Sequence, residues 1–160
     1  MTISLTVTDD DGNTDTETFE ITVVNTDVAE APDGNGDGDG DAFNDTNGNG
    51  VYDEGEEIVN KTTLENGYND PDSDLVIYPS VGSIQSSGGP VSIRAKTISA
   101  GVDFTASGDG VNLIAEGDIR IDDVTLTPNS NRGINITSTG DRIFADRTEM
   151  NAKQGSIELN

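Results

Sequence analysis

The sequence has no cysteine, no histidine and no tryptophan, and only eight of its 160 residues are Lys or Arg. Without cysteine, neither a disulfide nor a thiolate metal site can form, and without histidine no Ser-His-Asp catalytic arrangement can exist. The formal net charge of −23 disfavours binding to nucleic acid or to anionic membranes, whose phosphates need a basic surface. Cations, and calcium above all, remain as natural partners.

Apolar residues are also scarce, at 31% of the chain with 4% aromatic, so we expect a modest core. No apolar stretch approaches the length of a membrane span, which argues against membrane insertion. The N-terminal residues Met1 to Ser4 lack the basic and apolar regions of a signal peptide. We therefore expect the export signal to lie elsewhere, in a longer parent protein.

Charge divides the chain into unlike parts. Residues 1 to 74 hold 21 acidic residues and one base, Lys61, whereas residues 75 to 160 hold ten acidic residues and seven bases. With the pattern of apolar residues added, this predicts three segments: a hairpin at 1–26, an acidic calcium-binding segment at 27–74 and a repetitive β module at 75–160.

Alternating apolar residues near the N-terminus predict two β-strands joined by a turn at Asp9–Asn13. The first strand carries Ile3, Leu5 and Val7, and the second carries Phe19, Ile21 and Val23. The run from Leu5 to Asn13, followed by Ile-Thr-Val-Val-Asn25, resembles the closing hairpin of an immunoglobulin-like PKD domain of large bacterial surface proteins. That resemblance implies that a sandwich partner covers the apolar face, since a lone hairpin is marginal in water.

A twelve-residue run, Asp-Thr-Asn-Gly-Asn-Gly-Val-Tyr-Asp-Glu-Gly-Glu, begins at Asp45. It resembles an EF-hand calcium loop, because side-chain oxygens occupy its positions one, three, five, nine and twelve, with glycine at six. Gly50 permits the sharp turn. The predicted ligands are Asp45, Asn47, Asn49, the backbone carbonyl of Val51, Asp53 and Glu56.

The surroundings of this run are strongly acidic. Between Asp27 and Glu57 there are eleven Asp or Glu residues and no Lys or Arg. Without a cation these carboxylates repel one another and the Gly-rich chain stays disordered, so we expect metal binding and folding to be one event. A solvated acidic linker is the alternative. Asn-rich ligands suit millimolar calcium, which predicts an extracellular location, and Gly34 to Gly40 cannot supply the flanking helix of a sensor.

A second calcium site is predicted just upstream, at Asp37-Gly-Asp39-Gly-Asp41-Ala-Phe43-Asn-Asp45. Its paired carboxylates resemble the calcium repeat of thrombospondin type 3, although Ala42 replaces the usual glycine. A shifted register restores the glycine, as Gly38, and uses Asp33, Asn35 and Asp37 instead. Three further carboxylates are candidate extra ligands: Asp70, Asp72 and Asp74.

The C-terminal part repeats itself. Similar apolar stretches begin at Gly89, Gly110, Gly133 and Gly155, in steps of 21, 23 and 22 residues. That period is typical of one coil of a parallel β-solenoid, with three strands per coil. The predicted interior residues include Val111, Leu113, Ile134, Ile136, Ile157 and Leu159. An ordinary β-sandwich of short strands is the competing structure.

The repeat Gly-x-Ile-x-Leu-x-x-x-Gly-Asp-Ile-x-Ile occurs in related forms at Gly110–Ile121 and Gly133–Ile143. It resembles the filamentous-haemagglutinin repeats of secreted bacterial adhesins. The resemblance implies a right-handed parallel β-helix, a rod that holds a binding element away from the cell. The predicted fold is therefore mainly β: a hairpin of an Ig-like sandwich, a calcium-binding loop segment and a right-handed β-helix.

These observations favour a non-catalytic, calcium-stabilised structural segment of an extracellular bacterial surface protein of the adhesin type. Ca²⁺ is the expected ligand, and neighbouring copies or domains of the same protein are expected partners. The chain enters a strand at once and stops part-way round a coil. We expect either a piece of a longer protein or a subunit that polymerises end to end into an extracellular fibre.

A carbohydrate-binding or polysaccharide-lyase-like β-helix is the other alternative. Its catalytic candidates would be Asp122, Asp123, Arg120 and Arg142, but three short coils give little of the shelter that shifts a catalytic pKa. These groups are more simply turn carboxylates paired with neighbouring arginines. Tyr68 and Tyr78 are candidates for stacking on sugars, and acidic glycans would need a basic face made by Arg94, Lys96, Arg120, Arg132, Arg142, Arg147 and Lys153.

Overall fold

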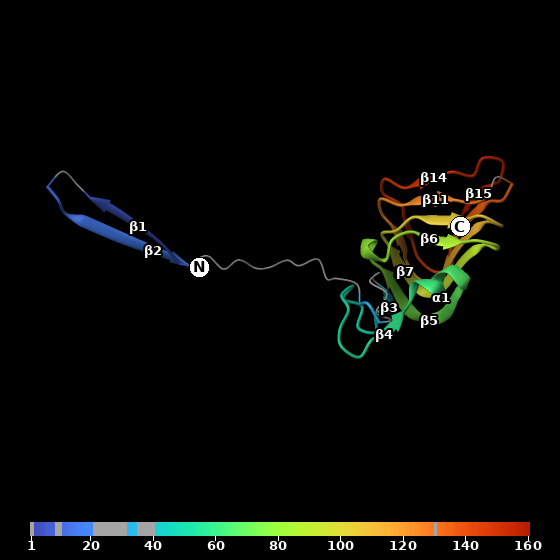
Figure 1. Ribbon diagram of the computed structural model, residues 1–160, viewed down its shortest axis with the longest axis horizontal. Helices are drawn as coiled ribbons and strands as arrows, with labels where there is room; N and C mark the ends of the chain where they lie inside the picture. Colours follow the sequence, from blue (N-terminus) through green and yellow to red (C-terminus); the bar gives the residue numbers. More distant parts are fainter. Residues whose placement is uncertain (1, 9–10, 21–31, 35–40, 130) are drawn as a thin grey trace.

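The computed structural model describes residues 2–8, 11–20, 32–34, 41–129 and 131–160. The described residues are mainly β, and they include an N-terminal hairpin and a β-solenoid of about four turns (Figure 1). The prediction of a β-solenoid is therefore confirmed. Within the same ranges no helix has the length and apolar character that a membrane span requires.

The hairpin consists of β1 (Thr2–Thr8) and β2 (Thr14–Glu20), which pair antiparallel. Ile3 lies opposite Phe19, and Thr8 lies opposite Thr14 beside the turn. The predicted hairpin is thus present. Ile21 and Val23 lie outside the described residues, and the membership of the hairpin in an immunoglobulin-like sandwich stays a prediction.

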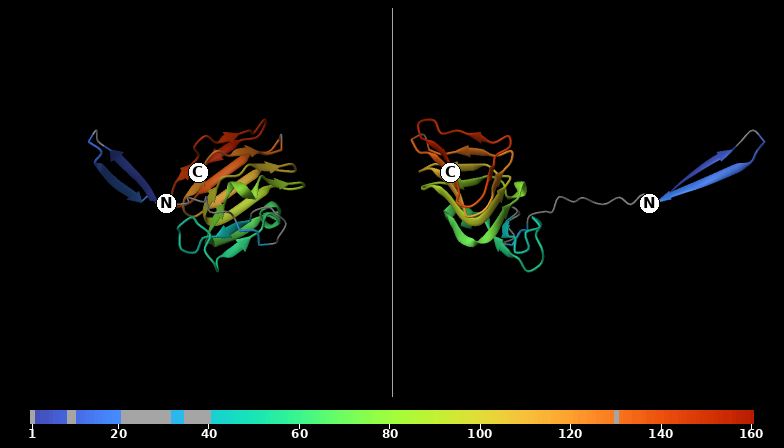
Figure 2. Two further views of the ribbon diagram at one scale, coloured as in Figure 1. Left: turned by 60° about the vertical axis from the view of Figure 1, so that its left-hand side comes forward. Right: turned by 180° about the vertical axis from the view of Figure 1, so that it is seen from behind.

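The solenoid is built from short parallel strands that stack coil on coil (Figure 2). Among the described residues its larger sheet runs in the order β15-β12-β9-β7-β5, with β10 pairing with β7 and β13, and a second sheet runs β14-β11-β8-β6. The strands are β5 (Tyr68–Ile77), β6 (Ile84–Ser86), β7 (Val91–Ala100), β8 (Phe104–Ala106), β9 (Val111–Ala115), β10 (Ile119–Ile121), β11 (Thr125–Thr127), β12 (Ile134–Ser138), β13 (Ile143–Phe144), β14 (Glu149–Met150) and β15 (Ile157–Leu159).

Apolar residues at matching positions of successive coils form columns inside the solenoid. One column is Ile93, Leu113, Ile136 and Leu159, each paired in register with the next. Its first three members have no exposed surface, because a further coil covers each of them, whereas Leu159 on the last strand is 53% exposed. The predicted interior is therefore confirmed for Val111, Leu113, Ile134 and Ile136, and wrong for Ile157 and Leu159.

The glycine repeat is offset by one residue at its two outer positions. Gly110 stacks on Gly133, but the residue stacked on Gly133 is Ser156, and the residue before Gly110 in the stack is Pro90. A Cβ on Gly110 would lie 2.6 Å from the Gly133 carbonyl oxygen, so this close approach requires glycine. The coil spacing is set by the apolar columns, with glycine needed where two backbones meet.

A small cap covers the first coil of the solenoid. It comprises β3 (Ala42–Asn44), β4 (Glu57–Val59) and α1 (Lys61–Asn66), and η1 (Pro79–Val81) follows β5. β3 pairs antiparallel with both β4 and β5, and the buried Leu64 of α1 joins the main core. The β-branched Ile58 and Val59 form part of β4, and Asn60 caps the helix that follows.

The cap and the solenoid share one core. Ala42 and Val59 belong to the same buried cluster as Ile93. β5 continues across residue 74, where the sequence predicts the end of the acidic segment. The twelve-residue loop from Asp45 to Glu56 is thus held between β3 and β4, at the capped end of the solenoid.

Candidate calcium loop

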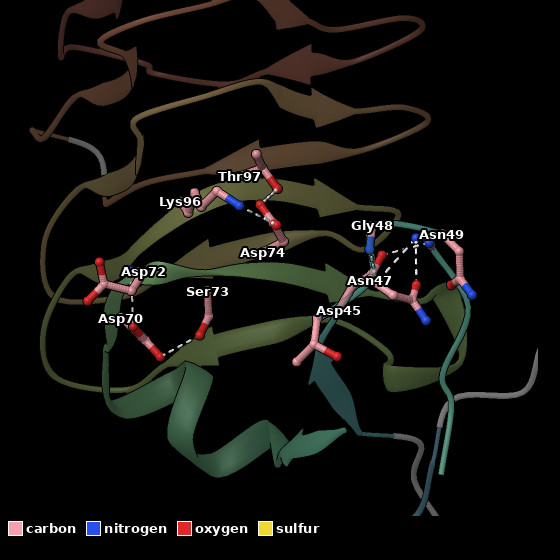
Figure 3. A network of polar contacts seen from close by, with 12 residues as sticks. Asp45, Asn47, Gly48, Asn49, Asp70, Asp72, Ser73, Asp74, Lys96 and Thr97 are labelled. Atoms are coloured by element: carbon pink, nitrogen blue, oxygen red, sulfur yellow. Dashed lines mark hydrogen bonds and ion pairs between the residues drawn. The ribbon is translucent and has the colours of Figure 1, made fainter. Parts of the chain in front are cut away.

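Asp45 begins the loop directly after β3 and is only 5% exposed. Its Oδ1 accepts hydrogen bonds from the backbone N–H groups of Gly48 (2.7 Å) and Asn49 (3.3 Å), and its Oδ2 accepts one from Gly50 (2.6 Å; Figure 3 shows the bonds of Gly48 and Asn49). Gly50 has φ of +75°, as the predicted sharp turn requires. One carboxylate therefore organises the first half of the loop.

Glu56, the last residue of the loop, is 8% exposed. Its Oε1 accepts hydrogen bonds from the backbone N–H of Thr46 (2.8 Å) and the Thr46 hydroxyl (3.1 Å), and its Oε2 accepts from the backbone N–H of Asp53 (2.9 Å). The two buried carboxylates at the ends of the twelve-residue run thus close it into a compact loop.

The side chains of Asn47 and Asn49 each form hydrogen bonds with two partners. Their Oδ1 atoms accept from the backbone N–H groups of Asn49 (3.0 Å) and Val51 (2.7 Å), respectively. Their amide nitrogens both donate to Oδ2 of Asp53, at 2.7 and 2.9 Å. Asp53 is exposed and is held by these two amides.

The loop offers the types of oxygen ligand that calcium prefers, namely carboxylate, amide and carbonyl oxygens. The structure does not gather all of them around one point: among the residues it describes, no three His, Cys, Asp or Glu side chains lie close enough together to hold a metal ion. Asp45 and Glu56 are buried in the closed loop, and Asp53 is occupied by the Asn47 and Asn49 amides. These oxygen ligands suit a hard cation. To bind Asp53, the cation would have to replace the hydrogen bonds that the Asn47 and Asn49 amides donate to it.

Aromatic residues fasten the loop to the cap. The ring of Phe43 is fully buried, and its centroid lies 5.6 Å from that of Tyr52 and 5.5 Å from that of Tyr78. The Asp45 backbone N–H donates to the Asp74 carbonyl in β5 (2.7 Å), which continues the pairing of β3 with the solenoid. The sequence gives no signal that Tyr78 joins Phe43 and Tyr52 in this cluster.

The second predicted site is only partly within the described residues, because Asn35, Asp37 and Asp39 lie outside them. Asp33 is exposed. Asp41 is 1% exposed, and its carboxylate accepts from the backbone N–H groups of Gly34 (2.9 Å) and Lys61 (3.2 Å). Asp41 therefore joins the segment before β3 to the start of α1, a structural role that its sequence pattern does not indicate.

Two of the three carboxylates suggested as extra ligands, those of Asp70 and Asp74, are engaged elsewhere. Asp74 accepts from the Lys96 ammonium (2.8 Å) and the Thr97 hydroxyl (2.7 Å), and this contact raises the pKa of Lys96 (Figure 3). Asp70 accepts from the Asp72 backbone N–H and the Ser73 hydroxyl, where the pairing of β5 with β7 shifts register. Asp70 and Asp74 thus stabilise β5 and its neighbour.

The residues considered for catalysis contact residues of neighbouring coils. Arg147 makes a two-pronged contact with Asp123, one coil earlier, and the bond lowers the pKa of the Asp123 carboxyl. Arg142 lies 3.6 Å from Asp118, the backbone N–H of Asp146 donates to Asp122, and Arg120 lies over the Phe144 ring at 4.3 Å. Asp122 and Asp123 are engaged by the following coil, as structural turn residues are.

An open groove runs beside the loop, with a volume of about 780 Å³. Gly48 to Gly50 form one wall, and outward-facing residues of successive coils, including Lys96, Thr97, Ser99 and Arg120, line the rest. Tyr78 also lines this groove, but its hydroxyl is directed at the loop backbone. Tyr68 is 8% exposed and donates to Asn44, so it is placed for packing rather than for stacking on a sugar.

No protein-family model matches the sequence, and comparison with curated proteins and with solved structures finds no match. The fold itself defines the class: the chain is a β-solenoid protein, mainly β, with a capped first coil and an acidic loop on the cap.

Proposed function

We propose that this chain is a non-catalytic, calcium-stabilised structural segment of an extracellular bacterial surface protein. The observation that carries the proposal is the burial of Asp45 and Glu56 at the two ends of one loop. In the part of the chain that the structure describes, neither carboxylate forms an ion pair with a Lys or Arg. Two buried anions that are held only by neutral groups favour a bound cation.

Calcium would be held by Asp45, Asn47, Asn49, the Val51 carbonyl, Asp53 and Glu56. Because Asn47 and Asn49 donate to Asp53, binding would exchange these two hydrogen bonds for contacts to the ion. That exchange, together with two neutral amide ligands, argues for weak affinity, on the order of 10⁻⁴–10⁻³ M, as in extracellular calcium modules. A site of this affinity would be filled outside the cell and empty in the cytosol.

The mechanism of the segment is mechanical. The loop lies on the cap of the solenoid, directly after the acidic run that leads back to the hairpin. Neutralising its carboxylates would stiffen this junction and fix the direction in which the rod leaves it. The resemblance of the repeats to those of adhesins supports a right-handed β-helical rod as the element so oriented, and the PKD-like hairpin supports a multidomain surface protein as its setting.

Limited proteolysis with a glutamate-specific protease tests this proposal. Glu54 is exposed near the end of the loop, so the rate of cleavage there reports how firmly the loop is closed. Chelator should speed cleavage of the wild type at the loop and leave the far-UV β signal of the solenoid nearly unchanged. Equal cleavage rates with calcium and with chelator would contradict the proposal.

Two variants sharpen this test. Glu56→Gln should abolish the protection by calcium, because it removes a ligand that closes the loop. Glu57→Gln makes the same chemical change one residue later, at an exposed side chain whose Oε2 accepts from Asn44, and should keep the protection.

Carbohydrate binding is the second candidate function, and the groove of about 780 Å³ beside the loop is the observation that favours it. Arg120 offers a guanidinium there that stacks on Phe144. A glycan array with wild type and Arg120→Ala separates the two functions. Binding that is lost in the variant would support the carbohydrate function, and an array without bound glycan would remove it.

A further inference from the structure

Tyr78 contacts the loop directly before Val51, the residue whose carbonyl is the predicted backbone ligand. Its hydroxyl donates a 2.6 Å hydrogen bond to the carbonyl oxygen of Gly50, 28 residues earlier. The Tyr78 hydroxyl therefore holds the peptide group between Gly50 and Val51.

The peptide group between Gly50 and Val51 is held at both ends. Its carbonyl oxygen accepts from the Tyr78 hydroxyl, and its N–H, which belongs to Val51, donates to the Oδ1 of Asn49 at 2.7 Å. Because a peptide group is planar, these two bonds fix its orientation, and the Val51 carbonyl follows it directly in the chain.

The position of Tyr78 is itself well determined. The residue follows β5 directly and precedes η1, with extended backbone angles of φ −73° and ψ 156°. Its ring packs at 5.5 Å on the buried Phe43, which pairs with Val76 of β5. The hydroxyl is thus carried by the first coil of the solenoid, while its hydrogen-bond partner, the Gly50 carbonyl, belongs to the loop.

We propose that Tyr78 is a positioning residue that fixes the Gly50–Val51 peptide group beside the predicted carbonyl ligand and couples the occupancy of the loop to the stability of the first coil. This inference rests on the proposed calcium function. Because coupling between two sites is reciprocal, a cation in the loop protects β5, and an intact first coil raises the affinity of the loop. Burial raises the pKa of Tyr78, so the hydroxyl keeps its proton and its donor role at neutral pH.

Tyr78→Phe tests this coupling, because it removes the hydroxyl and keeps the ring on Phe43. Calorimetric titration with CaCl₂ should give an affinity weaker by about five- to tenfold, the effect of one lost hydrogen bond. Amide hydrogen exchange should show calcium-dependent slowing in the loop and in β5 of the wild type, but only in the loop of the variant. A merely structural role would weaken β5 equally with and without calcium.

Tyr68→Phe is the matched control. It removes a hydrogen-bonded hydroxyl of β5, the one bonded to Asn44, and leaves the contact between Tyr78 and Gly50 intact. It should lower stability and retain the calcium-dependent slowing of β5. If Tyr78→Phe does not fold, the wild type alone decides: calcium must slow exchange of the loop amides and of β5 together.

The outcomes separate the two proposals. A wild-type chain that gives no saturable heat with CaCl₂ overturns the calcium function, and the coupling with it. A wild type that binds calcium, with unchanged affinity and unchanged protection of β5 in Tyr78→Phe, overturns the role of Tyr78 alone. Protection of the loop without β5 in the wild type does the same.

Discussion

The hydroxyl of Tyr68 donates a 2.6 Å hydrogen bond to the side-chain oxygen of Asn44, which is itself only 3% exposed. This bond ties the first strand of the solenoid to the strand that leads into the acidic loop. It also means that the cap cannot move away from the first coil without breaking a buried polar contact, which costs more than an exposed one.

Tyr68 should make the protein sensitive to alkaline pH. Burial, the largest cause, and the nearby Asp70 raise the pKa of Tyr68 to about 12 from the ordinary value of 10.0. Because the folded value is the higher one, the contribution of Tyr68 to stability is complete below about pH 10 and is lost as pH rises through about 12.

Absorbance at 295 nm during an alkaline titration checks this expectation. One of the three tyrosines should ionise near pH 12, and Tyr68→Phe should remove that step. Ionisation of all three tyrosines near the ordinary value in the folded protein would contradict it.

Two leucines of one apolar column should respond differently to the same truncation. Leu113 has no exposed surface, whereas Leu159 in the same column is 53% exposed. Leu113→Ala should lower the free energy of unfolding by about 2–5 kcal/mol through lost burial and a cavity, and Leu159→Ala by less than about 1 kcal/mol. Urea unfolding followed by circular dichroism measures both, and equal losses would mean that the coils do not stack as observed.

Gly133 lies where the backbones of two coils approach closely, and it should not tolerate a side chain. A Cβ on Gly133 would lie 2.6 Å from the carbonyl oxygen of Ser156, so Gly133→Ala should cost about 1–3 kcal/mol of unfolding free energy. Gly88→Ala is the control, because no atom lies within 4 Å of its added Cβ. A thermal shift for Gly88→Ala as large as that for Gly133→Ala would show that lost glycine flexibility, rather than the close approach, determines the effect.

The buried Asp41 carboxylate should be needed as a hydrogen-bond acceptor, both with and without a bound metal ion. Asp41→Asn replaces one carboxylate oxygen by an amide donor and leaves either the Gly34 or the Lys61 N–H without its partner. We expect a loss of about 1–3 kcal/mol in the free energy of unfolding, with or without chelator. Asp72→Asn, at an exposed side chain, should cost much less. If chelator removes the difference between the two variants, Asp41 acts through a metal instead.

The solenoid was predictable because its signal repeats. Ile93, Leu113, Ile136 and Leu159 occur at nearly equal spacing, and parallel stacking turns that spacing into one column. Their sequence pattern could not reveal that Leu159 is exposed, since exposure depends on whether a further coil covers the strand. The outer glycines, Gly89 and Gly155, each lie one residue before the position that stacks on the neighbouring coil, which Pro90 and Ser156 occupy.

Calcium binding by the loop stays a prediction, and the contacts within the loop were not predictable. The twelve-residue pattern indicates the sharp turn at Gly50, which has φ of +75°, but not the backbone N–H groups that Asp45 and Glu56 bind. Tyr78 was not predictable as an anchor, since it lies 28 residues from Gly50 and meets it only once β3 pairs with β5. Asp41 stays a predicted ligand, and its contacts with two backbone N–H groups were not predictable, because its spacing to other carboxylates is the same whether it faces an ion or these groups.

Calorimetric titration of the intact chain with CaCl₂ tests the central claim most directly, with Glu56→Gln and Glu57→Gln beside the wild type. We expect saturable heat with a dissociation constant on the order of 10⁻⁴–10⁻³ M for the wild type and for Glu57→Gln, and an affinity at least about tenfold weaker for Glu56→Gln. No saturable heat in the wild type, or identical titrations of the wild type and Glu56→Gln, would contradict calcium binding by this loop.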